Sequence, residues 1–226
     1  MERRTLLAAG GAALLGGAGF LALRPGPHGE TSNMFVSMAN AQEAGATAAI
    51  PDMVLGDPEA PIEVIEYASY TCPHCANFHT GMFKDIKENY IDTGKVKFVY
   101  REVYFDLPGL WASMVARCGG NDQRFFGITN IIYDKQREWI SSGDPAVISQ
   151  ELMRIGLTAG LTQETLDVCM SDADQAQSLM AWYQENAERD NVTGTPSFVI
   201  NGEKYSANSV RTFADFAAVL DDLLAG

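Results

Sequence analysis

Two cysteines separated by two residues form the most reactive group in the chain. Cys72 and Cys75 lie in the run Thr-Cys-Pro-His-Cys, directly after a stretch at 62–67 that is rich in β-branched residues. An amphipathic segment follows, which predicts a strand-to-helix junction at the cysteines. The free N–H groups and the positive dipole end of a helix N-terminus stabilise a thiolate, the reactive form of cysteine. Cys72 is therefore predicted to be the nucleophile.

Cys75 is predicted to complete the reaction that Cys72 begins. It lies one turn into the helix, on the same apolar stripe as Phe78, where it is shielded but close enough to attack a disulfide formed on Cys72. Pro73 lacks an N–H group, and its fixed φ suits the first turn of a helix. His74 can donate a hydrogen bond or carry charge beside the sulfur. The helix N–H groups and this imidazole therefore favour a lowered pKa for Cys72.

A second motif lies far downstream. Gly194-Thr195-Pro196 precedes an apolar run at 197–200, and Asn-Gly follows that run before a second short extended segment. Asn-Gly between two extended segments is a strong signal for a β-hairpin. The last segment, about 210–224, has its apolar residues on one face, which predicts a helix that covers the sheet.

These motifs, in this order, resemble those of the DsbA-like thiol:disulfide oxidoreductases of the thioredoxin superfamily, over roughly residues 53–226. The resemblance implies a cis proline at Pro196 that lies against the cysteines, with Thr195 offering its backbone to an extended substrate peptide. It also implies a buried acid under the active site at Glu66, which relays the proton that Cys75 must lose. No cofactor is implied other than the redox-active disulfide itself.

The chain departs from the best-known pattern of that family at two positions. Thr71, rather than an aromatic residue, precedes Cys72, and Thr195, rather than valine, precedes the proline. A threonine before the proline also occurs in disulfide isomerases and in other branches of the superfamily. The dithiol chemistry is expected, and its direction stays open between oxidase, isomerase and reductase.

The pattern of the chain predicts an α/β protein with a thioredoxin fold that is split by an all-helical domain. A strand at 62–67, a helix at about 72–90 and an alternating strand at 96–101 form a βαβ unit. Helical periodicity then recurs without a strand pattern, and Asp144 and Thr162 look like helix N-caps. The predicted thioredoxin-like domain consists of 53–105 and 191–226, and the helical insertion spans 106–190.

The first residues have the layout of an export signal. Residues 1–24 combine a basic start, Arg3-Arg4, with an apolar run at 6–23. Twin-arginine and general secretion both fit this start. The nearest Ala-x-Ala is distant, at 39–41, so cleavage and retention as a membrane anchor both stay open. Either way, the folded part is predicted to face an oxidising compartment, the periplasm of a Gram-negative bacterium, where a retained anchor would tether it to the inner membrane.

Composition limits the partners. The chain has 16 basic and 29 acidic residues and a formal net charge of −13, which argues against nucleic acid. Residues 25–52 are rich in small residues and contain three prolines near their ends, which indicates a linker. This segment lacks a long apolar period and therefore argues against an oligomerisation element. We expect a monomer.

Two further cysteines and a histidine have alternative interpretations. Cys118 and Cys169 lie on apolar stripes of the helical insertion, and an even cysteine count in an exported chain favours a structural disulfide between them. Free buried thiols and a second redox centre are the alternatives. His79 could join Cys72 and Cys75 as a metal ligand, but no fourth ligand lies nearby. A buried helix histidine near the active-site acid is favoured, and no metal site is predicted.

The sequence thus predicts an exported enzyme that introduces disulfide bonds into reduced, unfolded client proteins. The resemblance implies that a membrane partner similar to DsbB restores its disulfide. An isomerase or reductase of the same superfamily is the first alternative. A metal-binding module with a thioredoxin-like fold is the second, but the peptide-docking edge expected at Thr195 favours disulfide exchange.

Overall fold

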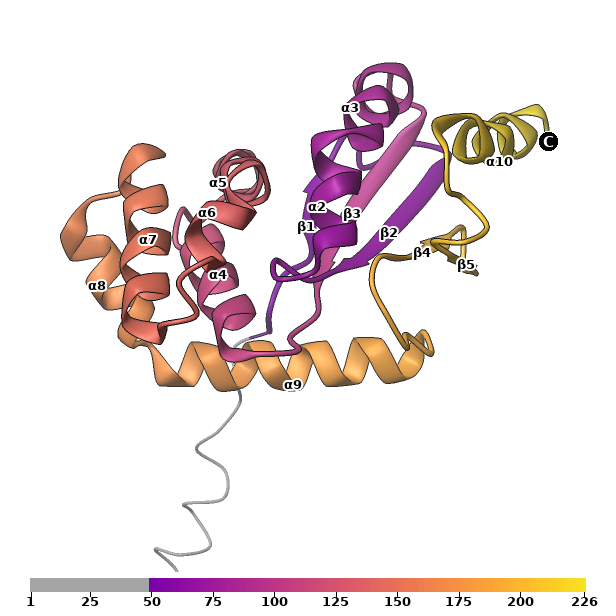
Figure 1. Cartoon of the computed structure of the whole chain (residues 1–226). Helices are drawn as coiled ribbons and strands as arrows, with labels where there is room; N and C mark the ends of the chain where they lie inside the picture. The colour runs from indigo at the N-terminus through magenta and orange to yellow at the C-terminus, as the bar shows by residue number, and fades with distance from the viewer. Residues whose placement is uncertain (1–48) are drawn as a thin grey trace, which may run out of the picture. The chain divides into compact units, whose positions relative to one another are not determined.

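A five-stranded mixed sheet lies at the centre of the structure (Figure 1). The structure is a computed structural model that describes residues 49–226. The predicted export segment and most of the predicted linker lie outside these residues. The strand order is β1-β3-β2-β4-β5. The strands are β1 (Met53–Leu55), β2 (Ile62–Ala68), β3 (Val96–Glu102), β4 (Ser197–Ile200) and β5 (Glu203–Ser206).

The central strands are buried on both faces. β2 and β3 are parallel, and the other neighbouring pairs are antiparallel. Val64 and Phe98 pack into the cluster on one face, whereas Ile65 and Val99 pack into the cluster on the other. This explains why both strands read as nearly continuous apolar runs, which is typical of a parallel pair covered on two sides.

The short edge strand β1 was not predicted. It pairs with β3 through Met53 and Tyr100, and its three residues are too few to show a period. Gly56 follows it with a φ of 98°. A Cβ atom on Gly56 would lie 2.5 Å from the carbonyl oxygen of Val96, so the turn after β1 requires glycine.

The predicted active-site helix is interrupted. One helix was expected over 72–90, but the chain forms α2 (Pro73–Thr80), α3 (Met82–Ile86) and a π-helical turn, η1 (Lys87–Ile91). The break lies at Gly81, whose φ of −118° and ψ of −104° are not helical. Glycine has a low helix propensity, which explains why the helix is interrupted at this residue. The first segment, α2, contains Cys75, and Cys72 is its N-cap residue.

Six helices fill the region between β3 and β4. They are α4 (Leu107–Arg117), α5 (Asp122–Asp134), α6 (Gln136–Ile140), α7 (Pro145–Thr158), α8 (Gln163–Ser171) and α9 (Ala173–Arg189). The predicted caps are present, since Asp144 accepts from the N–H of Ala146 and Thr162 accepts from that of Thr165. Together with the thioredoxin-like elements, these helices form one compact unit. The predicted fold class, a thioredoxin fold with inserted helices, is confirmed.

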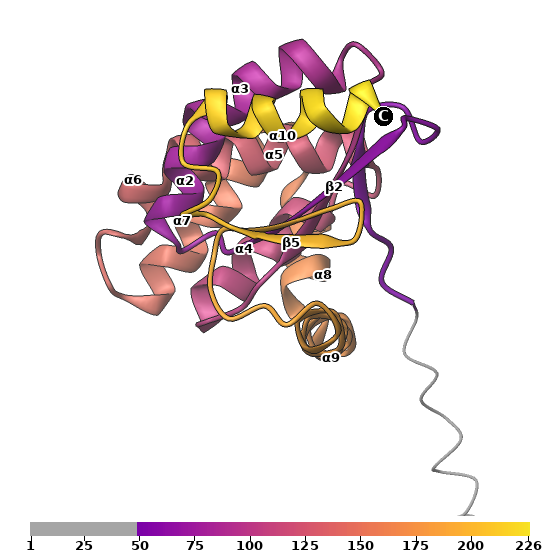
Figure 2. The same cartoon turned by 90° about the vertical axis from the view of Figure 1, so that its right-hand side faces the viewer.

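Helices cover both faces of the sheet (Figures 1 and 2). The long helix α9 crosses one side, and α2, α3 and α10 (Phe213–Ala225) lie on the other. The hairpin before α10 turns at Asn201 and Gly202, both with positive φ, as the Asn-Gly signal predicted. α10 begins after Thr212, which forms a capping box with Asp215. The expected start near residue 210 was therefore too early.

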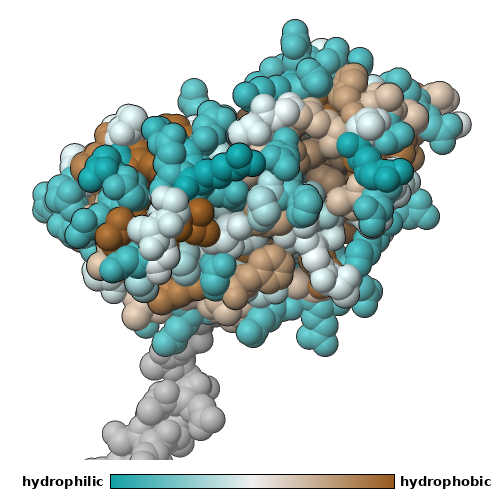
Figure 3. All heavy atoms as spheres, viewed as in Figure 1, coloured by the Kyte–Doolittle hydropathy of each residue, from teal (hydrophilic) through white to brown (hydrophobic). Residues whose placement is uncertain are grey.

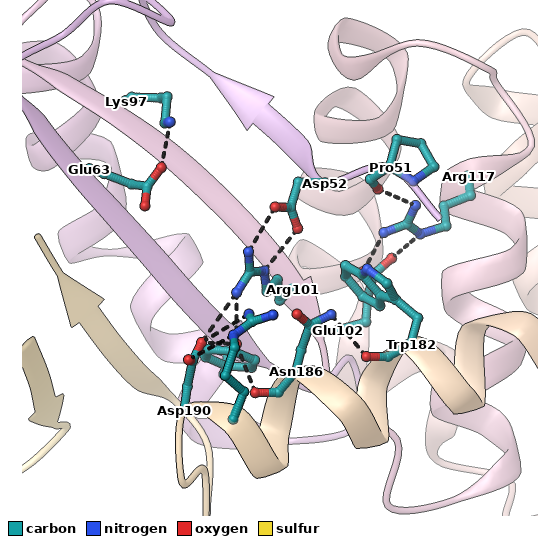
Figure 4. Close-up of polar contacts among 12 residues, drawn as sticks. Pro51, Asp52, Glu63, Lys97, Arg101, Glu102, Arg117, Trp182, Asn186 and Asp190 are labelled. Atoms are coloured by element: carbon teal, nitrogen blue, oxygen red, sulfur yellow. Dashed lines mark hydrogen bonds and ion pairs between the residues drawn. The ribbon is translucent and has the colours of Figure 1, made fainter. Parts of the chain in front are cut away.

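Two arginines join the sheet to the segments around it (Figure 4). Arg101 of β3 donates to both carboxylate oxygens of Asp52 at 2.8 Å and to Asp190, after α9, at 3.2 Å. Arg117 of α4 donates to Glu102 and, at 3.0 Å, to the carbonyl oxygen of Pro51. Residues 51 and 52, which were assigned to the linker, are therefore bonded to the folded unit.

Several large apolar side chains are exposed on the surface. Figure 3 shows hydrophobic residues scattered among hydrophilic ones on one face. Val168 is 65% exposed and Phe105 is 58% exposed.

Within residues 49–226, no helix is both long and apolar enough to cross a membrane.

Candidate active site

The sulfur of Cys72 lies at the N-terminus of α2. Cys72 is the N-cap residue and is partly exposed. Its pKa is lowered to about 5. The largest cause is a hydrogen bond from the Cys75 thiol, and Thr195 and the backbone N–H groups of Cys75 and His74 also lower it, against the opposing effect of burial. At neutral pH the favoured form of Cys72 is therefore the thiolate.

Cys75 has the opposite character. Its side chain is fully buried, and burial is the largest cause of a pKa well above the usual value. The hydrogen bond to Cys72 and the charge of Glu66 raise the pKa further. The two sulfur atoms of the motif are thus a stabilised thiolate and a protonated thiol.

The two residues between the cysteines form the first turn of α2. Pro73 occupies the first helical position, as predicted. His74 is exposed and lines the pocket beside the cysteines, and its backbone N–H contributes to the lowered pKa of Cys72. A helix N-terminus orients its N–H groups toward the cap residue, so this stabilisation does not require the side chain.

Strand pairing brings the two motifs together. β2 leads into Cys72, and β4 follows Pro196, so the pairing of Tyr67 with Ser197 aligns the segments. The peptide bond between Thr195 and Pro196 is cis. The carbonyl oxygen of Thr195 lies 3.5 Å from the Sγ atom of Cys72. The juxtaposition that the resemblance implied is present in the structure.

A pocket of about 470 Å³ lies beside this junction. His74 and Thr195 line it next to the cysteines, and apolar residues such as Met82 and Phe198 form much of the rest. Arg211 contributes a basic side chain. The pocket is large enough for a side chain of a bound peptide.

Glu66 lies on β2, 0% exposed. Burial is the largest cause that raises its pKa, His79 lowers it, and the charge of Cys72 raises it again. Nε2 of His79 is 2.8 Å from Oε2 of Glu66. His79 was considered as a metal ligand with the two cysteines, but within residues 49–226 no group of three or more His, Cys, Asp or Glu side chains is arranged to hold a metal. His79 instead pairs with the buried acid.

The remaining cysteines form a disulfide. Cys118, at the end of α4, is bonded to Cys169 of α8, with an S–S distance of 2.08 Å. Their positions on apolar stripes suggested that both residues are buried, but both are partly exposed. The bond joins two helices of the insertion.

One residue that contacts the site was not identified from the sequence. Gln136 of α6 is buried, and its side-chain amide donates to the carbonyl oxygens of Tyr70 and Cys72 at 2.8 and 2.9 Å. It thereby holds the loop that presents Cys72. No sequence signal identifies it, because a glutamine in a short amphipathic helix has no distinctive spacing from the motif.

Comparisons with known proteins agree with this geometry. A family model described as thioredoxin matches residues 48–222. A protein of Rickettsia bellii named "Putative protein-disulfide oxidoreductase" is 38% identical over 169 residues, covering 74% of this chain and 64% of that protein. This chain therefore spans less than two thirds of that relative.

This chain covers a larger share of two solved structures than of that relative. The crystal structure of Wolbachia pipientis alpha-DsbA1 has 32% sequence identity and a TM-score of 0.67, and the match covers 77% of this chain and 92% of that one. Oxidised BdbD from Bacillus subtilis, at 21% identity and a TM-score of 0.68, covers 77% and 94% and shares the fold. The chain belongs to the DsbA-like thiol:disulfide oxidoreductases of the thioredoxin superfamily.

Proposed function

We propose that this protein is an exported disulfide donor that oxidises reduced, unfolded client proteins. The observation that carries the proposal is the opposite character of the two sulfur atoms. Cys72 is partly exposed with a pKa lowered to about 5, whereas Cys75 is buried with a raised pKa. Stabilising the thiolate stabilises the reduced pair, which makes the disulfide form a strong oxidant.

The reaction proceeds through a mixed disulfide. A client thiolate attacks Sγ of Cys72, the more accessible sulfur, and the bond to Cys75 breaks with the electron pair going to Cys75. A second client thiolate then attacks the client sulfur of the mixed disulfide, and Cys72 leaves as a stabilised thiolate. The client dithiol is oxidised, and the enzyme disulfide is reduced to a dithiol. No cofactor other than the Cys72–Cys75 pair takes part.

Glu66 serves the proton balance at Cys75. The buried Cys75 sulfur must gain a proton when it leaves and lose one when the disulfide is restored. A carboxyl group whose pKa is raised by burial can exchange a proton with a thiol more readily than an ordinary carboxylate can. This supports the proton relay that the resemblance implies.

Thr195 and Pro196 form the docking edge for the client. The backbone of Thr195 lies next to Cys72, and the adjoining pocket provides apolar walls. An extended peptide that binds here places its own cysteine close to the Cys72 sulfur. Recognition through the backbone does not depend on client sequence, which suits a donor with many clients.

The location and the partners follow from the N-terminal residues and from the chemistry. We infer export to the periplasm of a Gram-negative bacterium, with residues 6–23 acting either as a cleaved signal or as a tether to the inner membrane. A membrane partner similar to DsbB accepts the electrons and restores the disulfide. The enzyme acts as a monomer.

Trapping of the mixed disulfide tests the roles of the two cysteines. Reduced Cys75→Ser protein is expected to accumulate a mixed disulfide with a disulfide-bonded peptide, because Cys72 can attack but nothing resolves the product. Cys72→Ser is the matched control and should accumulate none. Normal turnover by the Cys75→Ser variant, or trapping by Cys72→Ser alone, would contradict the assignment.

Isomerase activity is the second candidate, favoured by Thr195. An isomerase in this superfamily generally has two or three catalytic domains around a shared cleft. We expect rapid oxidation of a reduced peptide and weak reshuffling of a scrambled protein by a species that sedimentation shows to be monomeric. A stable dimer or trimer with strong isomerase and little oxidase activity would make isomerase the function.

A further inference from the structure

The pair formed by Glu66 and His79 contains polar atoms without protein partners. His79 is 3% exposed on α2, and its ring stacks on Tyr133 of α5 with centroids 4.4 Å apart. Within residues 49–226, Oε1 of Glu66 and Nδ1 of His79 have no hydrogen-bond partner. Buried polar atoms are normally paired, because leaving one unpaired is costly. Because protein groups do not satisfy these two atoms, water in an adjoining cavity is the partner that remains for them.

A small pocket connects His79 with the surface. Its volume is about 150 Å³, and buried His79 and Tyr133 line it together with the exposed residues Lys84, Asn130 and Asp134. One water occupies roughly 30 Å³ in the liquid, so the pocket accommodates several. Its lining shares no residue with that of the larger pocket beside Thr195. Protons can thus reach the buried pair from a side that the client does not cover.

The groups around His79 favour proton transfer through its ring. Glu66 lies on the Nε2 side, and the opposite nitrogen, Nδ1, is unpaired. The other titratable groups that face His79 or line its pocket are Tyr100, Tyr133, Lys84, Lys87 and Asp134. The two tyrosines have pKa values raised well above the usual value, chiefly by burial, so they remain protonated near neutral pH.

We propose that His79 carries the proton of Cys75 from Glu66 to water in this pocket when the dithiol is oxidised. The inference rests on the proposed function and adds a relay residue to it. Glu66 alone does not complete the route, since its side chain is 0% exposed. The two nitrogens of an imidazole can accept a proton on one side and release one on the other.

The step balances in atoms and charge. Cys75 attacks the Cys72 sulfur of a mixed disulfide, its S–H bond breaks, and the new S–S bond forms. The bond between Cys72 and the partner breaks, and the partner's sulfur leaves as a thiolate with the electron pair. The proton of Cys75 passes to Glu66, Glu66 gives a proton to Nε2 of His79, and Nδ1 of His79 releases one to water.

Glutathione separates the relay from the chemistry that it serves. The reduced full chain is mixed with oxidised glutathione, quenched with acid at intervals and analysed by mass spectrometry. Formation of the mixed disulfide on Cys72 reports nucleophilic attack, and its decay to the Cys72–Cys75 disulfide reports resolution. If the wild-type protein forms neither an adduct on Cys72 nor the Cys72–Cys75 disulfide, the proposed function fails. A change in resolution alone concerns only the relay.

His79→Gln is the decisive variant, because its side-chain amide can still donate to Glu66 but cannot pass a proton on. We expect adduct formation at the wild-type rate and resolution slowed at least about tenfold near neutral pH, below the full effect of a positioned acid–base group. The difference should shrink as pH rises, because hydroxide then removes the proton directly. Resolution at the wild-type rate across the pH range would overturn the proposal.

Two further measurements distinguish a relay from a structural role. Adding Glu66→Gln to His79→Gln should cause no further slowing, because both residues lie on one route. In His79→Ala, added imidazole should restore resolution, whereas 1-methylimidazole, which lacks a second exchangeable nitrogen, should not. Multiplicative slowing by the two substitutions, or equal rescue by both compounds, would overturn the relay.

Discussion

At the scale of single residues, the surroundings of the sulfur atoms give two cysteines of one motif opposite properties. Cys72 has a pKa of about 5 because hydrogen bonds from Cys75, Thr195 and the helix N-terminus outweigh its burial. Titration of thiolate absorbance in the reduced protein should show a transition near pH 5. Cys72→Ser should lose this transition, and Cys75→Ala should keep a thiolate transition, shifted upward because residue 75 then has no side-chain donor. A first transition near pH 8.5, the value of free cysteine, would contradict the site geometry.

The same shift makes the stability of the reduced protein depend on pH. The folded-state pKa of Cys72 lies below its unfolded value of about 8.5. The stabilisation is therefore complete above about pH 8.5 and is lost as pH falls through about 5. The melting temperature of the reduced wild type minus that of Cys72→Ser should follow this curve. A constant difference between about pH 4 and 9 would argue against a stabilised thiolate.

At the scale of elements, the disulfide between Cys118 and Cys169 connects α4 with α8. Its two cysteines are separated by 51 positions in the sequence, and the chain-entropy model gives a stabilisation of about 4 kcal/mol for a loop of that length. We expect a Cys118→Ala/Cys169→Ala double variant to lose stability of this order in denaturant unfolding. Non-reducing peptide mapping of the wild type should show the two residues linked. Finding both thiols free in native protein would contradict the bond.

Some of these elements could be predicted from the sequence and others could not, depending on whether their signals are local. The hairpin at Asn201 and the caps at Asp144 and Thr162 were predictable because their signals are local. The break at Gly81 was missed, since apolar spacing continues across it. The roles of Gln136 and of the segment at 51–52 depend on contacts between residues distant in sequence, which no local pattern reports. The spacing of the motif at a strand-to-helix junction predicted the lowered pKa of Cys72, which hydrogen bonds produce against the effect of its burial. The raised pKa of Cys75 depends chiefly on its burial, whose extent the sequence does not give.

At the scale of the whole molecule, a buried ion pair joins the sheet to the helical insertion. Glu102 of β3 and Arg117 of α4 have side chains only 1% and 3% exposed, and Ser113 donates to the same carboxylate. Arg117→Met leaves Glu102 without its charged partner and should cost about 3–5 kcal/mol of unfolding free energy.

The control for that prediction is an exposed pair on α7. Arg154, 67% exposed, contacts Glu151, and Arg154→Met should change stability by less than about 1 kcal/mol. Sheet and insertion should still unfold in one transition in the wild type, because they form one compact unit. Equal effects of the two arginine substitutions would show that the buried pair does not hold the parts together.

The reduction potential of the Cys72–Cys75 pair tests the central claim, that this protein donates disulfides, most directly. It is measured by equilibration with glutathione buffers, alkylation and mass spectrometry. Because the thiolate of Cys72 stabilises the reduced form, we expect a potential more positive than about −200 mV, toward the about −120 mV of a strong oxidant. A value at or below about −270 mV, that of thioredoxin, would make the pair a reductant and contradict the account.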